Sequence, residues 1–225
     1  MTSVRDARSG VFITFEGIEG SGKTTQCARL AKRLREEGYR VVETREPGGT
    51  PLAERIRELL LNPPVAETIV PECEAFLILA ARSQHVAHEI APALHEGAVV
   101  LCDRFADSTL AYQGYARGLD PRRLATLNRI ATRGLAPHLT LLFDLPVQAG
   151  LARRRRQGLE HNRLDWETRA FHERVRKGFL TLAKRHSRRI KVLNARQDPD
   201  RLATQVASLV THLLDRHAVP RRHRP

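Results

Sequence analysis

The chain has 225 residues, of which 41% are hydrophobic and 28% are charged, proportions typical of a globular protein with room for one sizeable domain. No run of the sequence approaches the roughly 18 uninterrupted apolar residues that a membrane-spanning helix needs, and residues 1–10 are too polar for a signal peptide. We therefore expect a cytoplasmic protein without a membrane partner. The net charge of +13 favours polyanionic partners, either nucleic acid or phosphorylated small molecules.

Much of the positive charge lies in three clusters, at residues 153–156, 184–191 and 216–224. Proteins that bind single-stranded nucleic acid combine such clusters with aromatic side chains on which the bases stack, and no aromatic residue interrupts these three. We therefore expect solvated or phosphate-facing clusters and no stable nucleic-acid partner.

The cysteines at positions 27, 73 and 102 lie far apart and include no Cys-x-x-Cys pair. This spacing argues against a zinc site or a disulfide framework. Because Cys27 falls on the apolar stripe of a predicted helix and Cys102 ends an apolar run, we expect both to be small core residues.

Short apolar, β-branched runs predict five buried strands, at residues 11–16, 40–46, 98–103, 139–145 and 189–194. Runs such as Val99-Val100-Leu101 are apolar throughout, which is typical of parallel strands covered on both faces.

Helical spacing of apolar residues fills the intervals between the strands. It predicts helices from Lys23 to Glu36, along the stripe Leu52, Ile56, Leu59 and Leu60, and across residues 202–213. Helix starts are marked where a capping side chain precedes a proline, at Thr50-Pro51, Asp120-Pro121 and Asp198-Pro199. Alternating strands and helices predict one doubly wound α/β domain at residues 11–215, flanked by a disordered arm at 1–10 and a disordered basic tail at 216–225.

A glycine-rich motif follows the first predicted strand and opens the first predicted helix. Its sequence, Gly17-Ile18-Glu19-Gly20-Ser21-Gly22-Lys23-Thr24, satisfies G-x-x-x-x-G-K-[ST], the loop that cradles nucleotide phosphates. Glycines let successive backbone N–H groups point at phosphate oxygens, and the helix adds its positive N-terminal end. Lys23 can reach the β- and γ-phosphates of ATP, and the Thr24 hydroxyl can bind Mg²⁺.

Three further segments follow the loop: residues 44–50 (TREPGGT), residues 103–114 (DRFADSTLAYQG), and residues 162–176, which begin NRLD and end FHERVR. In this order the four segments resemble the thymidylate kinase family. The resemblance implies a P-loop NTPase fold with a five-stranded parallel sheet, and a homodimer. It also implies transfer of the ATP γ-phosphoryl group to dTMP, with Mg²⁺, to give dTDP and ADP.

The same resemblance implies roles for residues around the two phosphates. Arg104 would bridge the donor and acceptor phosphates, and Arg45 would hold the acceptor phosphate. Both lie near strand ends, so we expect them at the carboxyl edge of the sheet. Glu19 would contact the acceptor sugar and help order the metal shell. Asp103 would either orient Mg²⁺ through water or anchor Arg104.

On the acceptor side, Arg82 is similar to the family's base-reading arginine, while Tyr112 and Gln113 are similar to its sugar and base contacts. Residues of the matching segments complete the predicted substrate site, namely Glu46, Pro47 and Ser108. The family usually has an aromatic residue four positions before the base-reading arginine. Here that residue is Ile78, which would cover the base without the stacking contribution of roughly 1 kcal/mol.

Residues 150–165 form the predicted lid, a short basic segment that closes over the donor. The phosphate loop lacks an arginine, and family members of that kind carry a catalytic arginine in the lid. Arg153 and Arg156 are the candidates, and the sequence does not choose between them.

Two other functions stay open at this point. Ile78 in place of an aromatic residue keeps dUMP, dCMP or AMP as alternative acceptors. The high positive charge keeps a P-loop ATPase that binds nucleic acid as a second alternative.

Overall fold

Parallel strands rich in valine, leucine and phenylalanine form the centre of the protein, in a computed structural model that describes residues 10–63, 68–156, 163, 167–219 and 221. The strands are β1 (Val11–Glu16), β2 (Val41–Arg45), β3 (Val99–Asp103), β4 (Leu139–Asp144) and β5 (Ile190–Asn194). They form one sheet in the order β2-β3-β1-β4-β5, and every pair is parallel. The predicted α/β class and strand positions are confirmed.

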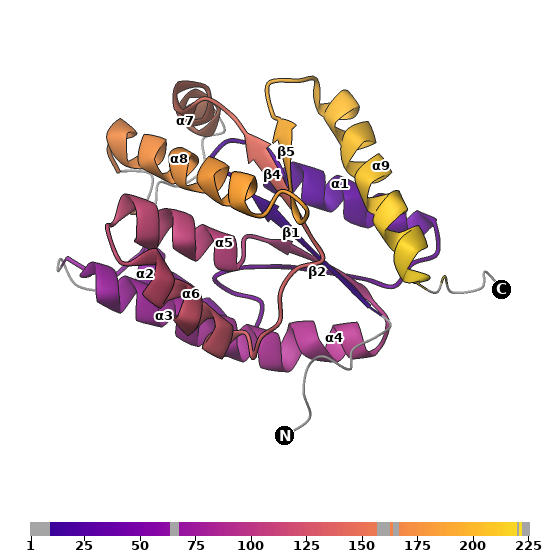
Figure 1. Ribbon diagram of the computed structural model, residues 1–225, viewed down its shortest axis with the longest axis horizontal. Coiled ribbons are helices and arrows are strands. Elements are labelled where there is room, and N and C mark those ends of the chain that lie inside the picture. The colour runs from indigo at the N-terminus through magenta and orange to yellow at the C-terminus, as the bar shows by residue number, and fades with distance from the viewer. Residues whose placement is uncertain (1–9, 64–67, 157–162, 164–166, 220, 222–225) are drawn as a thin grey trace.

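Helices cover both faces of this sheet (Figure 1). In chain order they are α1 (Lys23–Glu36), α2 (Pro51–Leu61), α3 (Pro71–His85), α4 (Ala91–His95), α5 (Ala106–Thr109), α6 (Pro121–Ala131), α7 (Val147–Arg156), α8 (Arg169–Arg185) and α9 (Pro199–His217). Two π-helical stretches, η2 (Val86–Ile90) and η3 (Leu110–Ala116), continue α3 and α5. No helix in the described part of the chain is both long and apolar enough to cross a membrane.

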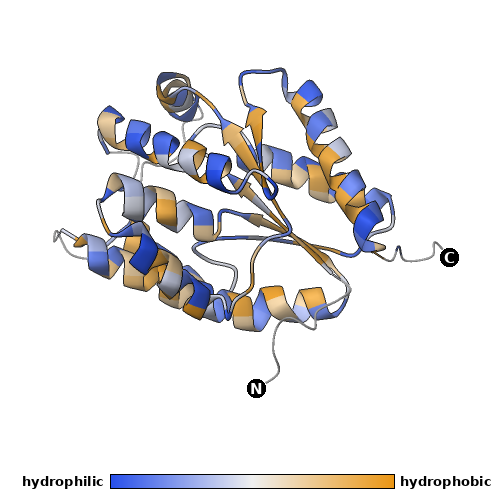
Figure 2. Ribbon diagram, viewed as in Figure 1, coloured by the Kyte–Doolittle hydropathy of each residue, from blue (hydrophilic) through white to orange (hydrophobic). Residues whose placement is uncertain are grey.

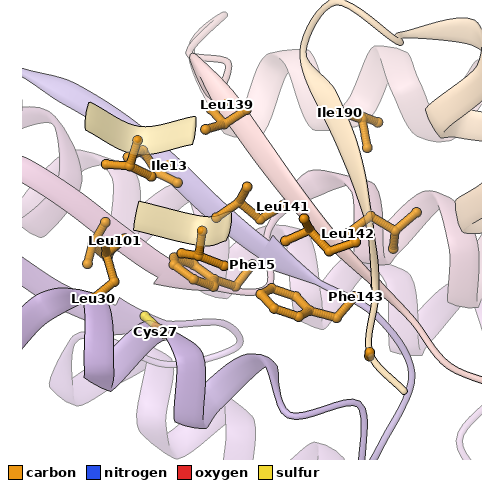
Figure 3. Close-up of a cluster of buried hydrophobic side chains, with 14 of the residues drawn as sticks. Ile13, Phe15, Cys27, Leu30, Leu101, Leu139, Leu141, Leu142, Phe143 and Ile190 are labelled. Carbon is orange, nitrogen blue, oxygen red and sulfur yellow. The ribbon is translucent and has the colours of Figure 1, made fainter. Parts of the chain in front are cut away.

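Successive residues of β1 pack into cores on opposite faces of the sheet, as the period of two in a strand requires. Ile13 and Phe15 lie in the larger core with Cys27 and Leu30 of α1, and Figure 3 shows this packing. Phe12 lies in the smaller core with residues of η2 and α4. Hydropathy colouring shows the strands as the most continuously apolar part of the fold (Figure 2).

The strand register sets the position of the site. Phe15 of β1 pairs with Asp103 of β3, which also pairs with Arg45 of β2. The carboxyl ends of these strands therefore meet at one edge, where ligands bind in open α/β sheets. Cys27 and Cys102 are 3% and 0% exposed, which confirms their predicted place in the core.

The predicted helix starts are also confirmed, because side chains of Thr50, Asp120 and Asp198 each accept a hydrogen bond from a backbone N–H in the first turn of α2, α6 and α9. Along α2, however, the predicted buried stripe is partly wrong. The helix buries Ala53 and Leu60, whereas Leu52 and Leu59 are exposed. The apolar side chains of α2 spread over more of the helix surface than α3 covers.

The predicted boundary of the C-terminal tail is placed too early. Helix α9 continues through His217, and Val219 beyond it is buried against the larger core. Arg221 donates a hydrogen bond to the Tyr39 hydroxyl at 3.0 Å. The predicted arm at residues 1–9 and the remainder of the tail, residues 220 and 222–225, lie outside the described residues.

Candidate active site

The glycine-rich motif forms a tight loop between β1 and α1. Gly20 and Gly22 have φ values of 70° and 86°, the left-handed region that side chains other than glycine rarely adopt. Gly20 also touches α7, because a Cβ atom added to it would lie 2.2 Å from the carbonyl oxygen of Gly150. Conformation and space thus both require glycine at position 20.

Lys23 is the first residue of α1, and its side chain folds back over the loop. Its ammonium group is buried and donates a hydrogen bond to the carbonyl oxygen of Ile18 at 3.2 Å. Burial and the nearby Arg104 lower the pKa of Lys23 to about 8. A buried cation at the N-terminus of a helix is an arrangement suited to an anionic ligand.

Thr24 and Asp103, the two predicted metal-binding residues, lie together at the end of β3. The Thr24 hydroxyl donates a hydrogen bond to Oδ2 of Asp103, and Oδ1 of Asp103 is buried without a hydrogen-bond partner in the described structure. Hard oxygen donors of this kind suit Mg²⁺. The guanidinium group of Arg104 is hydrogen-bonded to other residues, so no hydrogen bond in the described part of the chain supports Asp103 as its anchor.

Arg104 connects the phosphate loop to the next element of the site. Its Nη1 donates to the carbonyl oxygen of Gly17 at 3.1 Å and to Oγ of Ser108 at 3.2 Å. Its Nη2 pairs with Oε1 of Glu19 at 3.0 Å, and its guanidinium carbon lies 4.9 Å from the centre of the Tyr112 ring. With φ at 71°, the Arg104 backbone is in the left-handed region, a strained conformation of the kind that gathers at functional sites.

The two carboxylate oxygens of Glu19 have different neighbours. Its Oε1 accepts hydrogen bonds from Arg104 and from the Tyr112 hydroxyl, the latter at 2.6 Å. Burial opposes its ionisation, but the charge of Arg104 and contact with His172 outweigh burial and lower the pKa of Glu19. Its Oε2 lies 3.3 Å from Nδ1 of His172, a buried histidine of α8 whose ring nitrogens form no hydrogen bond within the described structure.

A cavity opens beside Arg104 and brings together every predicted substrate residue except Arg45. Its lining comprises Glu46, Pro47, Ile78, Arg82, Arg104, Phe105, Ser108, Thr109, Tyr112 and Gln113. The lining comes from the end of β2, from α3 and from the segment of α5 and η3. Residues that are far apart in the sequence thus face one another across this cavity.

Arg82 lies at the buried end of this cavity with 1% of its surface exposed. Its Nε donates to Oε2 of Glu46 at 2.7 Å, and its Nη1 donates to Thr109 and Asn128 at 2.8 and 2.5 Å. Nη2 forms no hydrogen bond with the described residues, so a residue that lines the cavity keeps one donor group unused. Glu46, a predicted substrate contact, is engaged by Arg82 and by His85, so it orients the arginine.

Arg45 lies at the carboxyl edge of the sheet as predicted, opposite Asp103. It does not line the cavity. Its Nη2 pairs with Oε2 of Glu54 at 2.9 Å, and more than half of the Arg45 side chain is exposed. Next to it, Arg57 donates to the carbonyl oxygen of Pro47, and burial and the charge of Arg45 lower the pKa of Arg57. Clustered arginines at this edge favour an anion there.

Ile78 lines the cavity at the position where the family usually has an aromatic residue, and Phe76 is 59% exposed on the outer side of α3. The cavity nevertheless contains the aromatic ring of Phe105, to which the sequence assigns no role. Phe105 forms part of its wall and lies under Arg82, with the guanidinium carbon 5.2 Å from the ring centre.

The lid arginines are divided between different surroundings. Arg153 and Arg156 are both exposed. Nη1 of Arg153 donates to the carbonyl oxygen of Ala195 at 3.1 Å, whereas Arg156, the last residue of α7, forms no hydrogen bond with the described residues. Arg163 donates to the carbonyl oxygen of Leu60 and to Glu74. The rest of the predicted lid, residues 157–162 and 164–165, lies outside the described residues.

Glu16, at the end of β1, is a site residue to which the sequence patterns assign no role. It is fully buried and accepts hydrogen bonds from the backbone of Phe105 at 2.8 Å and from Oγ of Ser108 at 2.6 Å. Burial, together with the charge of Asp107, raises the pKa of Glu16 to about 8. A charged residue ending an apolar strand next to the glycine-rich motif is the signal that marks it.

The sequence of this chain is similar to those of known thymidylate kinases. The sequence profile of the family described as Thymidylate kinase matches residues 15–206. A thymidylate kinase of Thermomicrobium roseum is 55% identical over 205 residues, covering 91% of this chain and 96% of the relative. One of Geobacter sulfurreducens is 53% identical over 218 residues, covering 95% of this chain and 100% of the relative.

A solved structure gives the same result at the level of the fold. The crystal structure of thymidylate kinase from Ehrlichia chaffeensis superposes with a TM-score of 0.72 at 34% identity, covering 90% of this chain and 99% of that chain. The expected P-loop fold is confirmed. By its sequence profile, its close relatives and its fold, the chain belongs to the thymidylate kinase family.

Proposed function

We propose that the chain transfers the γ-phosphoryl group of ATP to the 5′-phosphate of dTMP, giving ADP and dTDP. One observation carries the proposal. Arg104 donates a hydrogen bond to the phosphate loop at Gly17 and also lines the cavity that contains Arg82 and Gln113. A single guanidinium group therefore touches both the donor and the acceptor site, which is what joining two anions requires.

Phosphoryl transfer requires the protein to align the donor and acceptor phosphates and to neutralise their negative charge. An oxygen of the acceptor phosphate attacks the γ-phosphorus while the bond from that phosphorus to the β–γ bridging oxygen breaks. Lys23 and the backbone N–H groups of the loop bind the donor phosphates, and Arg104 stabilises the charge between donor and acceptor. Catalysis then comes from positioning and from fixed positive charge.

The proposal includes Mg²⁺ bound by the Thr24 hydroxyl and the Asp103 carboxylate. The orphaned Oδ1 of Asp103, buried beside the loop, supports this assignment because a buried carboxylate oxygen needs a partner. A bound Mg²⁺ ion would neutralise charge on the donor phosphates.

On the acceptor side, we assign Tyr112 and Glu19 to the sugar, and Arg82 and Gln113 to the base. Tyr112 is 5% exposed, and its hydroxyl donates a hydrogen bond to Glu19. Its ring is therefore fixed in place and would clash with the 2′-hydroxyl of a ribonucleotide. Ile78 and Phe105 cover the base by apolar contact. Arg45 and the neighbouring Arg57, which donates to the carbonyl oxygen of the cavity residue Pro47, attract the acceptor phosphate.

The proposed assembly is a homodimer. Large apolar side chains are exposed on α2, α3 and α6: Leu52 is 54% exposed, Leu59 45%, Phe76 59% and Ile130 67%. Helix α3 packs against both α2 and α6, and the three lie together in Figure 1. We call this surface the α2–α3–α6 face. Exposed apolar groups gathered in this way favour association, most simply between two copies around a two-fold axis.

The dimer is tested by sedimentation of Phe76→Asp, which is expected to move the protein from dimer to monomer. Val192→Asp is the matched control, since Val192 of β5 is 50% exposed outside the α2–α3–α6 face. A monomeric wild-type protein, or a dimeric Phe76→Asp variant, would contradict the proposed interface.

We also place the protein in the cytoplasm. Its cysteines are free thiols, two of them buried, a state that reducing compartments maintain. Fractionation of the native cells would test this location, and recovery of the protein in an exported fraction would contradict it.

The activity is tested by measuring ADP formation with ATP·Mg²⁺ and each of dTMP, dUMP, dCMP and AMP in turn. We expect the highest kcat/KM with dTMP. Preference for another monophosphate would overturn the acceptor assignment, and ATP hydrolysis that needs nucleic acid and no monophosphate would overturn the reaction itself.

A further inference from the structure

Glu74 is a buried acidic residue that does not line the cavity but is hydrogen-bonded to a residue that does. It lies in the first turn of α3 and is 1% exposed. Its Oε1 accepts a hydrogen bond from Nε2 of Gln113 at 2.6 Å. Its Oε2 is paired with Arg117 at 3.3 Å and with Arg163. Both carboxylate oxygens are therefore engaged, and Gln113 is the one of these three partners that lines the cavity.

The surroundings of Glu74 keep it ionised. Burial opposes ionisation, but the hydrogen bonds from Gln113 and Arg163 and the charge of Arg117 outweigh burial and lower the pKa of Glu74. An ionised carboxylate only accepts hydrogen bonds. Gln113 must therefore turn its amide nitrogen toward Glu74, which settles an orientation that side-chain shape alone does not distinguish.

The orientation of the Gln113 amide determines which of its atoms is available to a ligand. Nε2 donates one of its two N–H groups to Glu74, and Oε1 is left as an acceptor that forms no hydrogen bond with any described residue. Gln113 and Arg82 line the same cavity, and Nη2 of Arg82 is a donor with no partner in the described structure. Because both side chains line the cavity, Oε1 of Gln113 is the acceptor and Nη2 of Arg82 the donor that they can offer to a base.

This pattern matches one class of pyrimidine. Thymine and uracil present an N3–H donor and an O4 acceptor, whereas cytosine presents an N3 acceptor and an N4 amino donor. A base with the cytosine pattern would place acceptor against acceptor and donor against donor. Sites whose buried polar groups are left unpaired by the wrong ligand discriminate strongly.

We propose that Glu74 is a positioning residue that fixes the amide orientation of Gln113 and thereby selects thymine and uracil nucleotides against cytosine nucleotides. The inference rests on the proposed kinase activity. Glu74 acts through Gln113 and does not itself contact the acceptor.

The decisive variant is Glu74→Gln, which keeps the shape of the side chain. Its neutral amide can donate as well as accept, so Gln113 is free to turn its own amide over. We expect the ratio of kcat/KM for dTMP to kcat/KM for dCMP to fall at least about tenfold, a factor equivalent to about 1.4 kcal/mol. The ratio of dTMP to dUMP should stay unchanged, because these two bases share the same hydrogen-bonding edge.

Two further variants make the test specific. Glu72→Gln removes the same charge from the first turn of the same helix at an exposed position, and both ratios should equal those of the wild type. Glu74→Asp keeps an accept-only carboxylate, so it should lower the rates with every acceptor while holding the dTMP:dCMP ratio within about threefold of wild type.

A folded Glu74→Gln variant that keeps the wild-type ratio of kcat/KM for dTMP to that for dCMP would overturn the inference, even if the rates with both acceptors fall. If Glu74→Gln fails to fold, Glu74→Asp decides, and a tenfold change in its ratio would overturn the inference. Failure of the proposed function looks different, because the wild-type protein would then not phosphorylate dTMP at all.

Discussion

Nη2 of Arg104 lies 3.0 Å from Oε1 of Glu19, so an arginine of the acceptor cavity is ion-paired with an acid of the phosphate loop. Both side chains are mostly buried, and burial makes the loss of one partner costly. This pair fixes the guanidinium group between the glycine-rich loop and the cavity.

We predict that Arg104→Gln lowers kcat by about 10²–10³-fold, the effect of removing one preorganised donor to a charged transition state. Glutamine has the same branching at Cβ, so it adds no backbone strain at the left-handed φ of this position. Steady-state kinetics with dTMP would measure the loss, and Arg201→Ala, at an exposed position of α9, is the control. Turnover near the wild-type rate in a folded Arg104→Gln variant would rule out the bridging role.

The two lid candidates are expected to respond differently. Arg153 is held on the carbonyl oxygen of Ala195, so Arg153→Gln should cost about 1 kcal/mol of stability with little effect on kcat. Arg156, exposed at the end of α7, should be the arginine that reaches the γ-phosphate, and Arg156→Gln should lower kcat on the order of 10²-fold. Thermal unfolding and single-turnover rates separate the two effects. The reverse pattern would assign the catalytic role to Arg153.

Replacing Ile78 by phenylalanine should restore stacking on the base. A gain of about 1 kcal/mol from an aromatic pair corresponds to a KM for dTMP that is lower by about fivefold, with kcat unchanged. Phe105 already lines the same cavity, so an unchanged KM would mean that its ring, rather than residue 78, covers the base.

The buried Glu16 should give the stability of the protein a distinctive pH dependence. Its pKa rises from 4.5 to about 8 on folding, so between these values the folded state holds a proton that the unfolded state has released. The free energy of unfolding should therefore fall as pH rises through this window, by up to about 1.4 kcal/mol per pH unit. Glu16→Gln should remove this component.

Denaturant unfolding of both proteins from pH 5 to pH 8 would provide the measurement. Glu36→Gln, at an exposed position of α1, is the control and should follow the wild-type curve. Parallel curves for wild type and Glu16→Gln would show that the carboxyl group of Glu16 is already ionised at pH 5.

Local patterns were sufficient to predict much of this structure. Strand positions follow from apolar runs and helix starts from capping residues such as Thr50 and Asp198, because neighbours in sequence determine both. The glycine-rich loop is likewise specified by consecutive residues. These are the parts of the fold that need no knowledge of distant contacts.

Other features depend on residues that only folding brings together. Arg82 is fixed by Glu46, Thr109 and Asn128, the last of these 46 positions away, and no sequence spacing announces that set. Glu74 acquires its meaning from Gln113, 39 positions later. The exposed side of α2 was likewise not predictable, because helical periodicity locates an apolar arc without showing which part of it another helix covers.

The contact between Gly20 and Gly150 leaves no room for a methyl group on either residue, since a Cβ atom on Gly150 would lie 2.5 Å from the carbonyl oxygen of Glu19. Arg156 lies six positions after Gly150, about 9 Å along the helix. If α7 tilted by about 20° about the contact between the two glycines, its end at Arg156 would be displaced by about 3 Å, while Gly150 would hardly move. Any tilt of α7 would therefore have to turn about this contact, and a side chain added at either glycine would meet the backbone of the other segment.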